Sequence, residues 1–250
     1  MKKWKQALIF SLLLIPVAAI GGYCTMLYQL DYLDQEMVDQ AVAQVGSLEA
    51  VVAITVMQTV LYALVCGFFG HILANQLGLI RPFRLDQKAL VTTLALSLIG
   101  GILFSLDYWT FGAWIPGVRE TTDLTMSVHV IVASLLYGGV VEEVMLRLFM
   151  MSLIAFLMWK IFFRKREQAP QGVIIAANVI VALLFAAAHL PATIMLFGEL
   201  TPLIVFRCFL LNGGFGLLFG WLFRKYGIGY AMLSHALLHI ISKLIWLLFV

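Results

Sequence analysis

The stretch Leu124–Phe163 reads LTMSVHVIVASLLYGGVVEEVMLRLFMMSLIAFLMWKIFF and decides the fold of this chain. Charge rarely interrupts it, yet it holds the adjacent carboxylates Glu142 and Glu143 and, one helical turn further on, Arg147. An ionised side chain at membrane depth costs about 2.5–3.5 kcal/mol on insertion scales. Three such residues in one apolar segment therefore indicate a membrane helix with a polar site.

The rest of the chain has the composition of an integral membrane protein. Of its 250 residues, 63% are hydrophobic and 12% are charged, whereas soluble domains are about 45–50% apolar and about 25% charged. Apolar runs of about 20 residues, long enough to cross a bilayer, recur along it. We place the spans at Ala7–Tyr28, Ala50–Leu73, Ala89–Leu106, Leu124–Phe163, Val173–Phe197, Leu203–Phe223 and Ile228–Val250. The predicted fold is all-α: a polytopic transmembrane helical bundle of about seven spans.

The loops between these spans alternate in charge. Basic loops contain Lys2, Lys3, Lys5, Arg81, Arg84, Lys88, Lys160, Arg164, Lys165, Arg166, Arg224 and Lys225, and the loops between them are dominated by Asp31, Asp34, Glu36, Asp39, Glu49, Asp107, Glu120, Asp123 and Glu199. Because cytoplasmic loops carry an excess of Lys and Arg, we expect the N-terminus inside and the C-terminus outside. The short basic loops and the economy of a single domain suggest a bacterial chain, so we expect the bacterial plasma membrane as the location. The basic loops are too short for a nucleic-acid surface, so no nucleic-acid partner is expected.

The fourth segment is longer than one crossing needs. As a helix, Leu124–Phe163 would extend about 60 Å at 1.5 Å per residue, against a hydrocarbon core of about 30 Å. Two crossings would put the basic cluster that follows on the outside. We therefore expect one crossing, kinked at Gly138 and Gly139, whose later part extends along or beyond the cytoplasmic face. A re-entrant turn near Gly138 is the alternative.

The three charged residues of this segment differ in their predicted surroundings. Residues four apart share a helix face, so Glu143 and Arg147 are expected to pair. Glu142 then points elsewhere without a local counter-ion, which suits a general base in a poorly solvated pocket. A purely structural Glu–Arg network that fixes helix packing is the competing interpretation.

Three histidines in later spans are the other candidates for the site. His189 ends the sequence Phe185-Ala186-Ala187-Ala188-His189, whose small residues allow another helix to approach closely. His235 and His239 stand four apart in the last span, so both imidazoles project from one face. This pair could donate hydrogen bonds to an oxyanion, or it could join His189 and a carboxylate around a metal ion.

Crude depths place these groups in one pocket. At 1.5 Å per residue, His189 and His239 fall near the middle of the bilayer, and His235 and Glu142 fall nearer the cytoplasmic boundary. We expect a single pocket that leans toward the cytoplasmic half. Arg207 and Lys243 lie near the outer ends of their helices, where long side chains can extend to the membrane surface.

Three motifs in this order resemble those of one known family. Residues Glu142–Arg147 read EEVMLR and match the EExxxR signature of the CPBP family, which comprises CAAX prenyl proteases and bacteriocin-processing or immunity (Abi) proteins. Phe185–His189 matches the FxxxH motif of that family, and His235 begins its third motif. The resemblance covers roughly Leu124–Ile240. It divides the chain into N-terminal spans 1–3 (1–123) and a catalytic core (124–250) within one integral-membrane unit.

The resemblance implies an intramembrane glutamic endopeptidase that acts on a membrane-associated peptide or protein. In that family, Glu142 would activate a water with help from His189, His235 and His239 would stabilise the oxyanion, and Glu143 with Arg147 would support the site. The third motif of the family usually reads HxxxN, or has Asp in the last place, whereas this chain has His239. A neutral imidazole can donate one hydrogen bond as an amide does, so this role survives the change.

Two questions stay open at the level of sequence. We expect no cofactor, although zinc or another divalent metal held by Glu142, His189, His235 and His239 is the alternative. A non-catalytic bacteriocin immunity or scaffold protein would keep the same fold, and a proton-coupled transporter could use the same residues as a relay. The transporter is less favoured because no internal repeat accompanies it.

Overall fold

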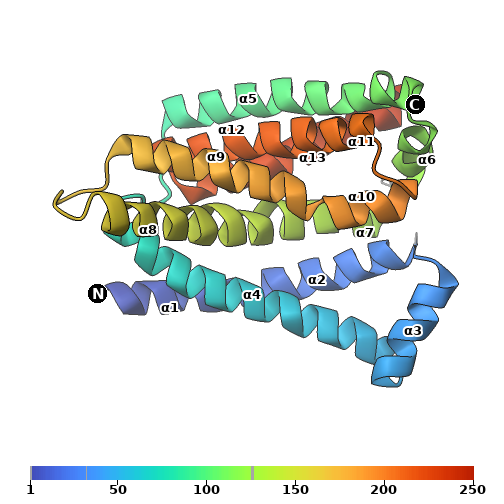
Figure 1. Cartoon of the computed structure of the whole chain (residues 1–250), viewed down its shortest axis with the longest axis horizontal. Helices are drawn as coiled ribbons and strands as arrows, with labels where there is room; N and C mark the ends of the chain where they lie inside the picture. Colours follow the sequence, from blue (N-terminus) through green and yellow to red (C-terminus); the bar gives the residue numbers. More distant parts are fainter. Residues whose placement is uncertain (1, 32, 125–126) are drawn as a thin grey trace.

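The computed structural model describes residues 2–31, 33–124 and 127–250, and in this part of the chain all regular structure is helical. Seven helical segments are long and apolar enough to cross a membrane, and they run side by side along the long axis of the molecule (Figure 1). They span Lys3–Leu30, Leu48–Gln76, Gln87–Ala113, Val128–Phe162, Gln171–Phe197, Pro202–Tyr226 and Ile228–Phe249. The predicted all-α bundle of seven spans is confirmed.

Several spans contain more than one helical element, and two short helices in the described ranges lie between spans. In chain order the helical elements are α1 (Lys3–Leu13), α2 (Ile15–Leu30), α3 (Gln35–Val45), α4 (Leu48–Gln76), α5 (Gln87–Ser105), η1 (Leu106–Tyr108), η2 (Phe111–Ala113), α6 (Pro116–Leu124), α7 (Val128–Ala133), η3 (Ser134–Glu142), η4 (Val144–Met151), α8 (Ser152–Phe162), α9 (Gln171–Ala188), α10 (Leu190–Phe197), α11 (Pro202–Cys208), η5 (Phe209–Gly213), α12 (Gly214–Tyr226) and α13 (Ile228–Phe249). Pro16 and Pro191 stand in the first turns of α2 and α10. Proline lacks an amide donor and is tolerated there, so these residues explain two of the breaks.

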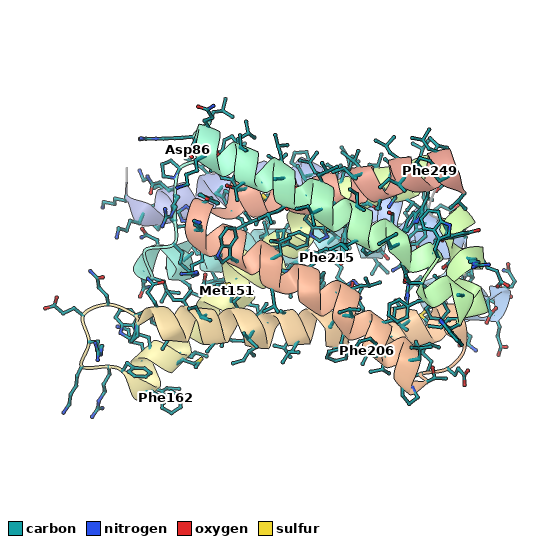
Figure 2. All side chains as sticks on the ribbon, turned by 90° about the horizontal axis from the view of Figure 1, so that it is seen from above. Asp86, Met151, Phe162, Phe206, Phe215 and Phe249 are labelled. Carbon is teal, nitrogen blue, oxygen red and sulfur yellow. The ribbon has the colours of Figure 1, made fainter. Side chains whose placement is uncertain are left out.

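The outside of the bundle is apolar. Side chains made mostly of carbon surround the helices (Figure 2), and Leu61, Leu183 and Leu247 are each more than half exposed. Large continuous apolar surfaces are rare on soluble proteins, whereas a bilayer solvates them. The protein is therefore an integral membrane protein whose lipid-facing surface is the wall of the bundle.

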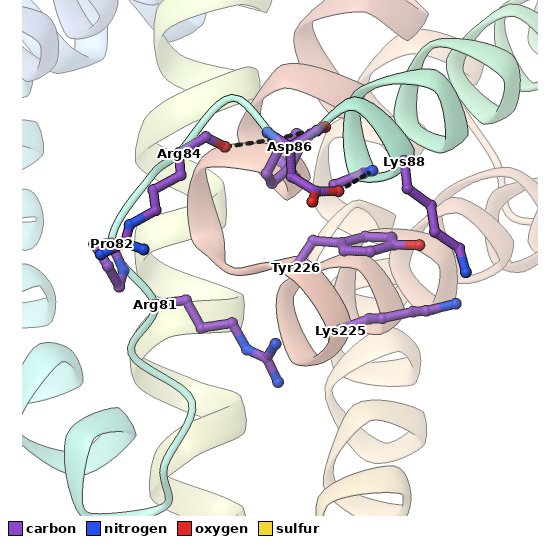
Figure 3. Close-up of a pocket in the computed structure, with 9 residues that line it drawn as sticks. Arg81, Pro82, Arg84, Asp86, Lys88, Lys225 and Tyr226 are labelled. Carbon is purple, nitrogen blue, oxygen red and sulfur yellow. Dashed lines mark hydrogen bonds between the residues drawn. The ribbon is translucent and has the colours of Figure 1, made fainter.

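The two ends of the bundle differ in charge. The N- and C-termini lie at opposite ends (Figure 1), as an odd number of crossings requires. At the N-terminal end, cations from two separate parts of the chain line a pocket of about 440 Å³ (Figure 3). Arg81 and Arg84 come from the α4–α5 connection and Lys88 from the first turn of α5, whereas Lys225 comes from the last turn of α12. The alternation of charge along the sequence thus becomes a separation in space, while the membrane side of each end stays a prediction.

The fourth span is one continuous helix from Val128 to Phe162. The sequence predicts a kink at Gly138 and Gly139, but the helix passes through both without a break and instead widens, with π-helical turns in η3 and η4 on either side of Glu143. A Cβ atom on Gly139 would lie 3.0 Å from the Cβ of Ala236. This glycine therefore serves the close approach of α13. The π-helical turns, which are frequent at functional sites, surround the paired carboxylates.

Small residues also bring the other helices together. A Cβ on Gly70 of α4 would lie 2.9 Å from the backbone of Leu148 and Phe149 in η4. On the opposite side, α5 packs along α13, where Ser97 donates a hydrogen bond of 3.0 Å to Ser234. Inside lipid there is little hydrophobic force between helices, so close backbone contact and interhelical hydrogen bonds hold them. The fourth span is thus fixed between α4 and α13.

The contact at Gly70 yields a stability prediction. In Gly70→Ala the new methyl group must displace the backbone of η4, and overpacking of this kind costs roughly 1–3 kcal/mol. We expect the Tm of the purified protein in detergent to fall by about 5 °C. Gly172→Ala is the matched control, because nothing lies within 4 Å of a Cβ at that position. Equal Tm values for the two variants would contradict the close packing of α4 on η4.

Candidate active site

A cavity of about 400 Å³ lies within the bundle and is lined by elements from six of the spans. Glu142, His189, His235 and His239 all contribute to its wall. The structure therefore brings four of the six predicted site residues to one shared space, as the sequence predicts. The other two, Glu143 and Arg147, lie behind the wall and are buried.

The carboxylate of Glu142 is not held by a hydrogen bond or an ion pair with a described residue. Glu142 ends η3 and is partly exposed to the cavity. Tyr137, from the preceding turn, lines the same cavity and lies close enough to interact with it electrostatically. The carboxylate oxygens are therefore available to a water molecule or a substrate.

The imidazoles of His235 and His239 converge on one point. Their rings stack with centroids 5.1 Å apart. A Cβ atom on Gly138 would lie 3.7 Å from the Nε2 of His235 and 3.6 Å from the Nε2 of His239. Because Gly138 has no side chain, the space in front of both nitrogens is open. A small polar group in the cavity can therefore reach both imidazoles together.

The hydrogen bonds of the two rings decide what each can donate. The Nδ1 of His235 lies 2.9 Å from the Oε1 of Glu143. A carboxylate only accepts, so Nδ1 carries the proton, and the Nε2 of a neutral His235 is an acceptor. The Nδ1 of His239 is buried and has no partner among the described residues. His239 is therefore free to carry its proton on Nε2 and to donate it into the cavity.

His189 is held at a break between two helices. It follows α9 and precedes α10, and its Nδ1 donates a hydrogen bond of 2.8 Å to the backbone oxygen of Phe185. The Phe185 ring meets the imidazole edge to face, with centroids 4.6 Å apart. These contacts fix the orientation of the ring and leave Nε2 as a proton acceptor.

Glu143 and Arg147 form a buried charged pair, as their spacing predicts. Glu143 is 0% and Arg147 1% exposed, and the Nη1 of Arg147 lies 3.4 Å from the same Oε1 that accepts from His235. The guanidinium lies over the rings of Phe185 and Phe219, 4.7 Å and 5.6 Å from their centroids. Cation–π contacts of this kind stabilise a charge that water does not reach. The pair thus anchors His235 from behind.

A glycine on α12 makes room for the guanidinium. A Cβ on Gly216 would lie 3.1 Å from the Nη2 of Arg147 and 3.3 Å from Ala182 of α9. The glycine-rich stretch of this span therefore permits close packing around the buried charge, which a larger residue would prevent.

The cavity extends in the opposite direction from the one that the depths in the sequence predict. The residues of the fourth span that line it, including Val130, Ser134 and Tyr137, precede Glu142 and lie toward the end that carries α6. The predicted lean toward the N-terminal end is wrong. The reason is that this helix of 35 residues is longer than one crossing needs, so distances counted from its apolar boundary do not fix the depth of Glu142.

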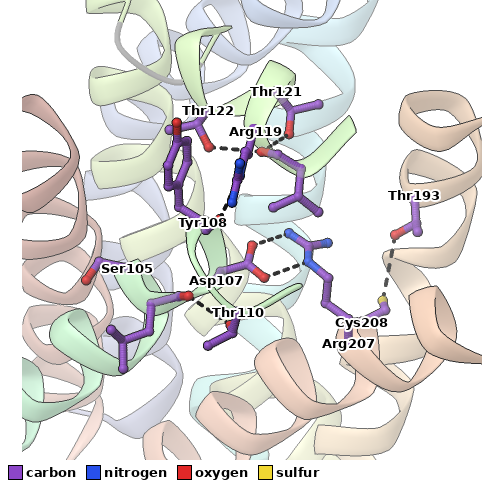
Figure 4. A network of polar contacts seen from close by, with 12 residues as sticks. Ser105, Asp107, Tyr108, Thr110, Arg119, Thr121, Thr122, Thr193, Arg207 and Cys208 are labelled. Carbon is purple, nitrogen blue, oxygen red and sulfur yellow. Dashed lines mark hydrogen bonds and ion pairs between the residues drawn. The ribbon is translucent and has the colours of Figure 1, made fainter. Parts of the chain in front are cut away.

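Three further charged residues line the cavity and were not predicted as site residues: Asp107, Arg207 and Lys243. The expectation that Arg207 and Lys243 extend to the membrane surface is wrong. Arg207 forms two hydrogen bonds with the carboxylate of Asp107, one of them 2.8 Å long (Figure 4). Lys243 is 8% exposed. The sequence contained a signal for it, since Lys243 continues the four-residue spacing of His235 and His239 on α13.

The metal alternative does not fit this arrangement. Glu142, His189, His235 and His239 share the cavity wall. However, within the described part of the chain no three His, Cys, Asp or Glu side chains are grouped so that they could hold a metal ion. We therefore derive no step through a metal, and the independence of the reaction from metal ions stays a prediction.

One comparison with known proteins gives a family match. Residues 124–241 match the family model of the type II CAAX prenyl endopeptidases, described as Rce1-like. The matched part contains all six predicted site residues, and the match agrees with the resemblance to the CAAX prenyl protease family that the motifs indicate. No curated protein and no solved structure matches the chain.

The geometry separates the roles of the two adjacent carboxylates, and thermal stability tests this. Arg147→Met leaves the Glu143 carboxylate buried without its guanidinium, and breaking a buried pair costs about 3–5 kcal/mol. We expect the Tm in detergent to fall by about 10 °C. Glu142→Gln should keep the Tm of the wild type, because it removes no ion pair with a described residue. A stable Arg147→Met protein would show that the buried pair does not hold the helices together.

Proposed function

We propose that this protein is a membrane-embedded endopeptidase that hydrolyses a peptide bond in a membrane-associated peptide or protein. The single observation that carries the proposal is the cavity whose wall holds Glu142, without a partner among the described residues, together with three imidazoles. The match of residues 124–241 to a protease family model supports the same reaction class. The apolar wall of the bundle supports a site inside the bilayer, within reach of substrates that reside in the membrane.

The proposed reaction begins with a water molecule bound between Glu142 and His189. Both can accept a proton, because the carboxylate is unpaired and the Nε2 of a neutral His189 is an acceptor. Glu142 takes a proton from the water while the oxygen attacks the carbonyl carbon of the scissile bond. General-base catalysis of this kind contributes typically 10²–10⁴-fold. The same proton then passes from Glu142 to the leaving amine as the C–N bond breaks.

The negative oxygen of the tetrahedral intermediate needs a donor, and we assign this role to His239. Its Nε2 faces the open space at Gly138, and its Nδ1 makes no competing hydrogen bond with a described residue. His235 reaches the same space and can donate there only when both of its nitrogens carry protons, because Nδ1 donates to Glu143. Glu143 and Arg147 then act as positioning residues for His235. The proposed steps need no metal ion or cofactor.

The charge distribution supports a membrane orientation. We infer that the N-terminal end, where the basic loops gather, faces the cytoplasm, since positive loops are retained on that side. The C-terminal end and α6 then face outward, and the cavity extends from the middle of the bundle toward that outer face.

Replacement of the proposed base tests the function. Glu142→Gln keeps the shape of the side chain and removes its basicity, so we expect cleavage to fall by at least about 10²-fold. Mass spectrometry of membrane peptides from cells that express the wild type or the variant measures this, because products should disappear and uncleaved substrate should accumulate. Glu199→Gln, in an exposed loop, is the matched control. An unchanged peptide pattern and phenotype with stably expressed Glu142→Gln would favour an immunity or scaffold protein instead.

The assignment of His239 is tested by two substitutions at one position. An asparagine retains an N–H donor, whereas a leucine has none, and loss of one oxyanion donor costs about 10²–10³-fold in kcat. We expect His239→Asn to keep activity within about ten-fold of the wild type and His239→Leu to lose about 10²-fold or more. Both should keep a similar KM. If the leucine variant cleaves as well as the asparagine variant, His239 does not stabilise the oxyanion.

A further inference from the structure

Lys243 is a buried cation in the wall of the cavity. It lies on α13 and is 8% exposed. It makes no hydrogen bond or ion pair with any residue in the described ranges. Burial of an ammonium group is costly unless an anion or several acceptors compensate it. A buried and uncompensated lysine at the wall of a substrate cavity therefore indicates that its counter-ion arrives with the ligand.

Two carboxylates in the cavity wall are candidates for an internal counter-ion, Asp107 and Glu142. Asp107 is 4% exposed. Both of its oxygens accept hydrogen bonds from Arg207 (Figure 4). Such a two-pronged pair is charge-neutral and geometrically satisfied. Glu142, the remaining carboxylate of the cavity wall, belongs to the turn that faces His235 and His239.

The position of Lys243 relative to His235 and His239 determines how far a substrate carboxylate bound by Lys243 would lie from the scissile bond. Residues four apart share a helix face, so His235, His239 and Lys243 form one line along α13, and all three line the cavity. At 1.5 Å per residue, the backbone of Lys243 lies about 6 Å beyond that of His239 and about 12 Å beyond that of His235. An extended peptide advances about 3.3 Å per residue. These lengths correspond to about two to four residues of bound peptide.

We propose that Lys243 is the carboxylate-binding residue of the substrate site. In a peptide whose scissile carbonyl lies in the space that His235 and His239 share, its ammonium group binds a carboxylate about two to four residues away. This inference rests on the proposed peptidase function and adds a specificity determinant to it. Either the α-carboxylate at the C-terminus of a peptide or the side chain of an Asp or Glu supplies the required chemistry.

Three peptides that differ only in their carboxylates test the proposal. The probes are 12-residue peptides of Leu, Ile, Val and Ala with an N-terminal fluorophore: a free acid, its C-terminal amide, and the amide with one internal Glu. Cleavage and binding are measured for each, the first by chromatography and the second by fluorescence anisotropy, with full-length protein in detergent. We expect at least one carboxylate peptide to exceed the plain amide by about ten-fold in kcat/KM and affinity, mainly through KM.

Two substitutions link this preference to Lys243. In Lys243→Met the ratio between carboxylate and amide peptides should fall to about one, and Lys243→Arg, which keeps the charge, should retain it. Lys5→Met, at an exposed position of α1, is the matched control and should keep the preference of the wild type. Whichever carboxylate peptide shows the preference identifies its source as a chain terminus or an acidic side chain.

The outcomes separate this inference from the function on which it rests. Equal cleavage and binding of all three peptides by the wild type, or a preference that survives in Lys243→Met, would overturn the role of Lys243 and leave the peptidase proposal standing. A preference in binding that depends on Lys243, without cleavage of any peptide, would support the carboxylate site and count against the peptidase.

Discussion

One oxygen atom connects the helices around this site. The Oε1 of Glu143 accepts from the Nδ1 of His235 and pairs with the guanidinium of Arg147, and all three side chains are buried. Charges in such surroundings are stable only while every partner stays in place. The cluster therefore ties η4 to α13. Through the rings of Phe185 and Phe219 it also contacts α9 and α12.

The close packing of the helices follows from this buried cluster. A charge in the membrane interior must be surrounded by protein, and neighbouring helices can approach only where side chains are small. Gly216 leaves the volume that the guanidinium occupies, and Gly139 brings the fourth span against Ala236 of α13. Gly138, one residue earlier, leaves volume that no side chain fills. Glycine residues thus allow the helices to enclose the buried Arg147 on one side and leave open space beside His235 and His239 on the other.

Much of this arrangement could be predicted from local spacing, and the rest depended on contacts between distant segments. The spans follow from hydropathy, and the pairing of Glu143 with Arg147 follows from helical periodicity. The direction in which the cavity extends could not be predicted in this way, because depth counted along a helix requires knowing where that helix meets the membrane surface. The partner of Arg207 is Asp107, at the end of another span, and spacing within one helix contains no information about it. Lys243 differs, because it shares a helix face with His235 and His239, so its place in the cavity wall follows once those histidines are assigned to the site.

The two adjacent glutamates show how a helix can give neighbouring carboxylates opposite roles. Side chains one residue apart diverge by about 100° in an α-helix, so one faces the interior of the bundle and the other faces the cavity. The Oε1 of Glu143 has a cationic and an imidazole partner, whereas Glu142 has no such partner among the described residues. A carboxylate that must accept a proton from water cannot also be held in an ion pair, because the pair would stabilise its charged form and weaken it as a base. The burial of one carboxylate in a fixed network is therefore what allows its neighbour to remain free for chemistry.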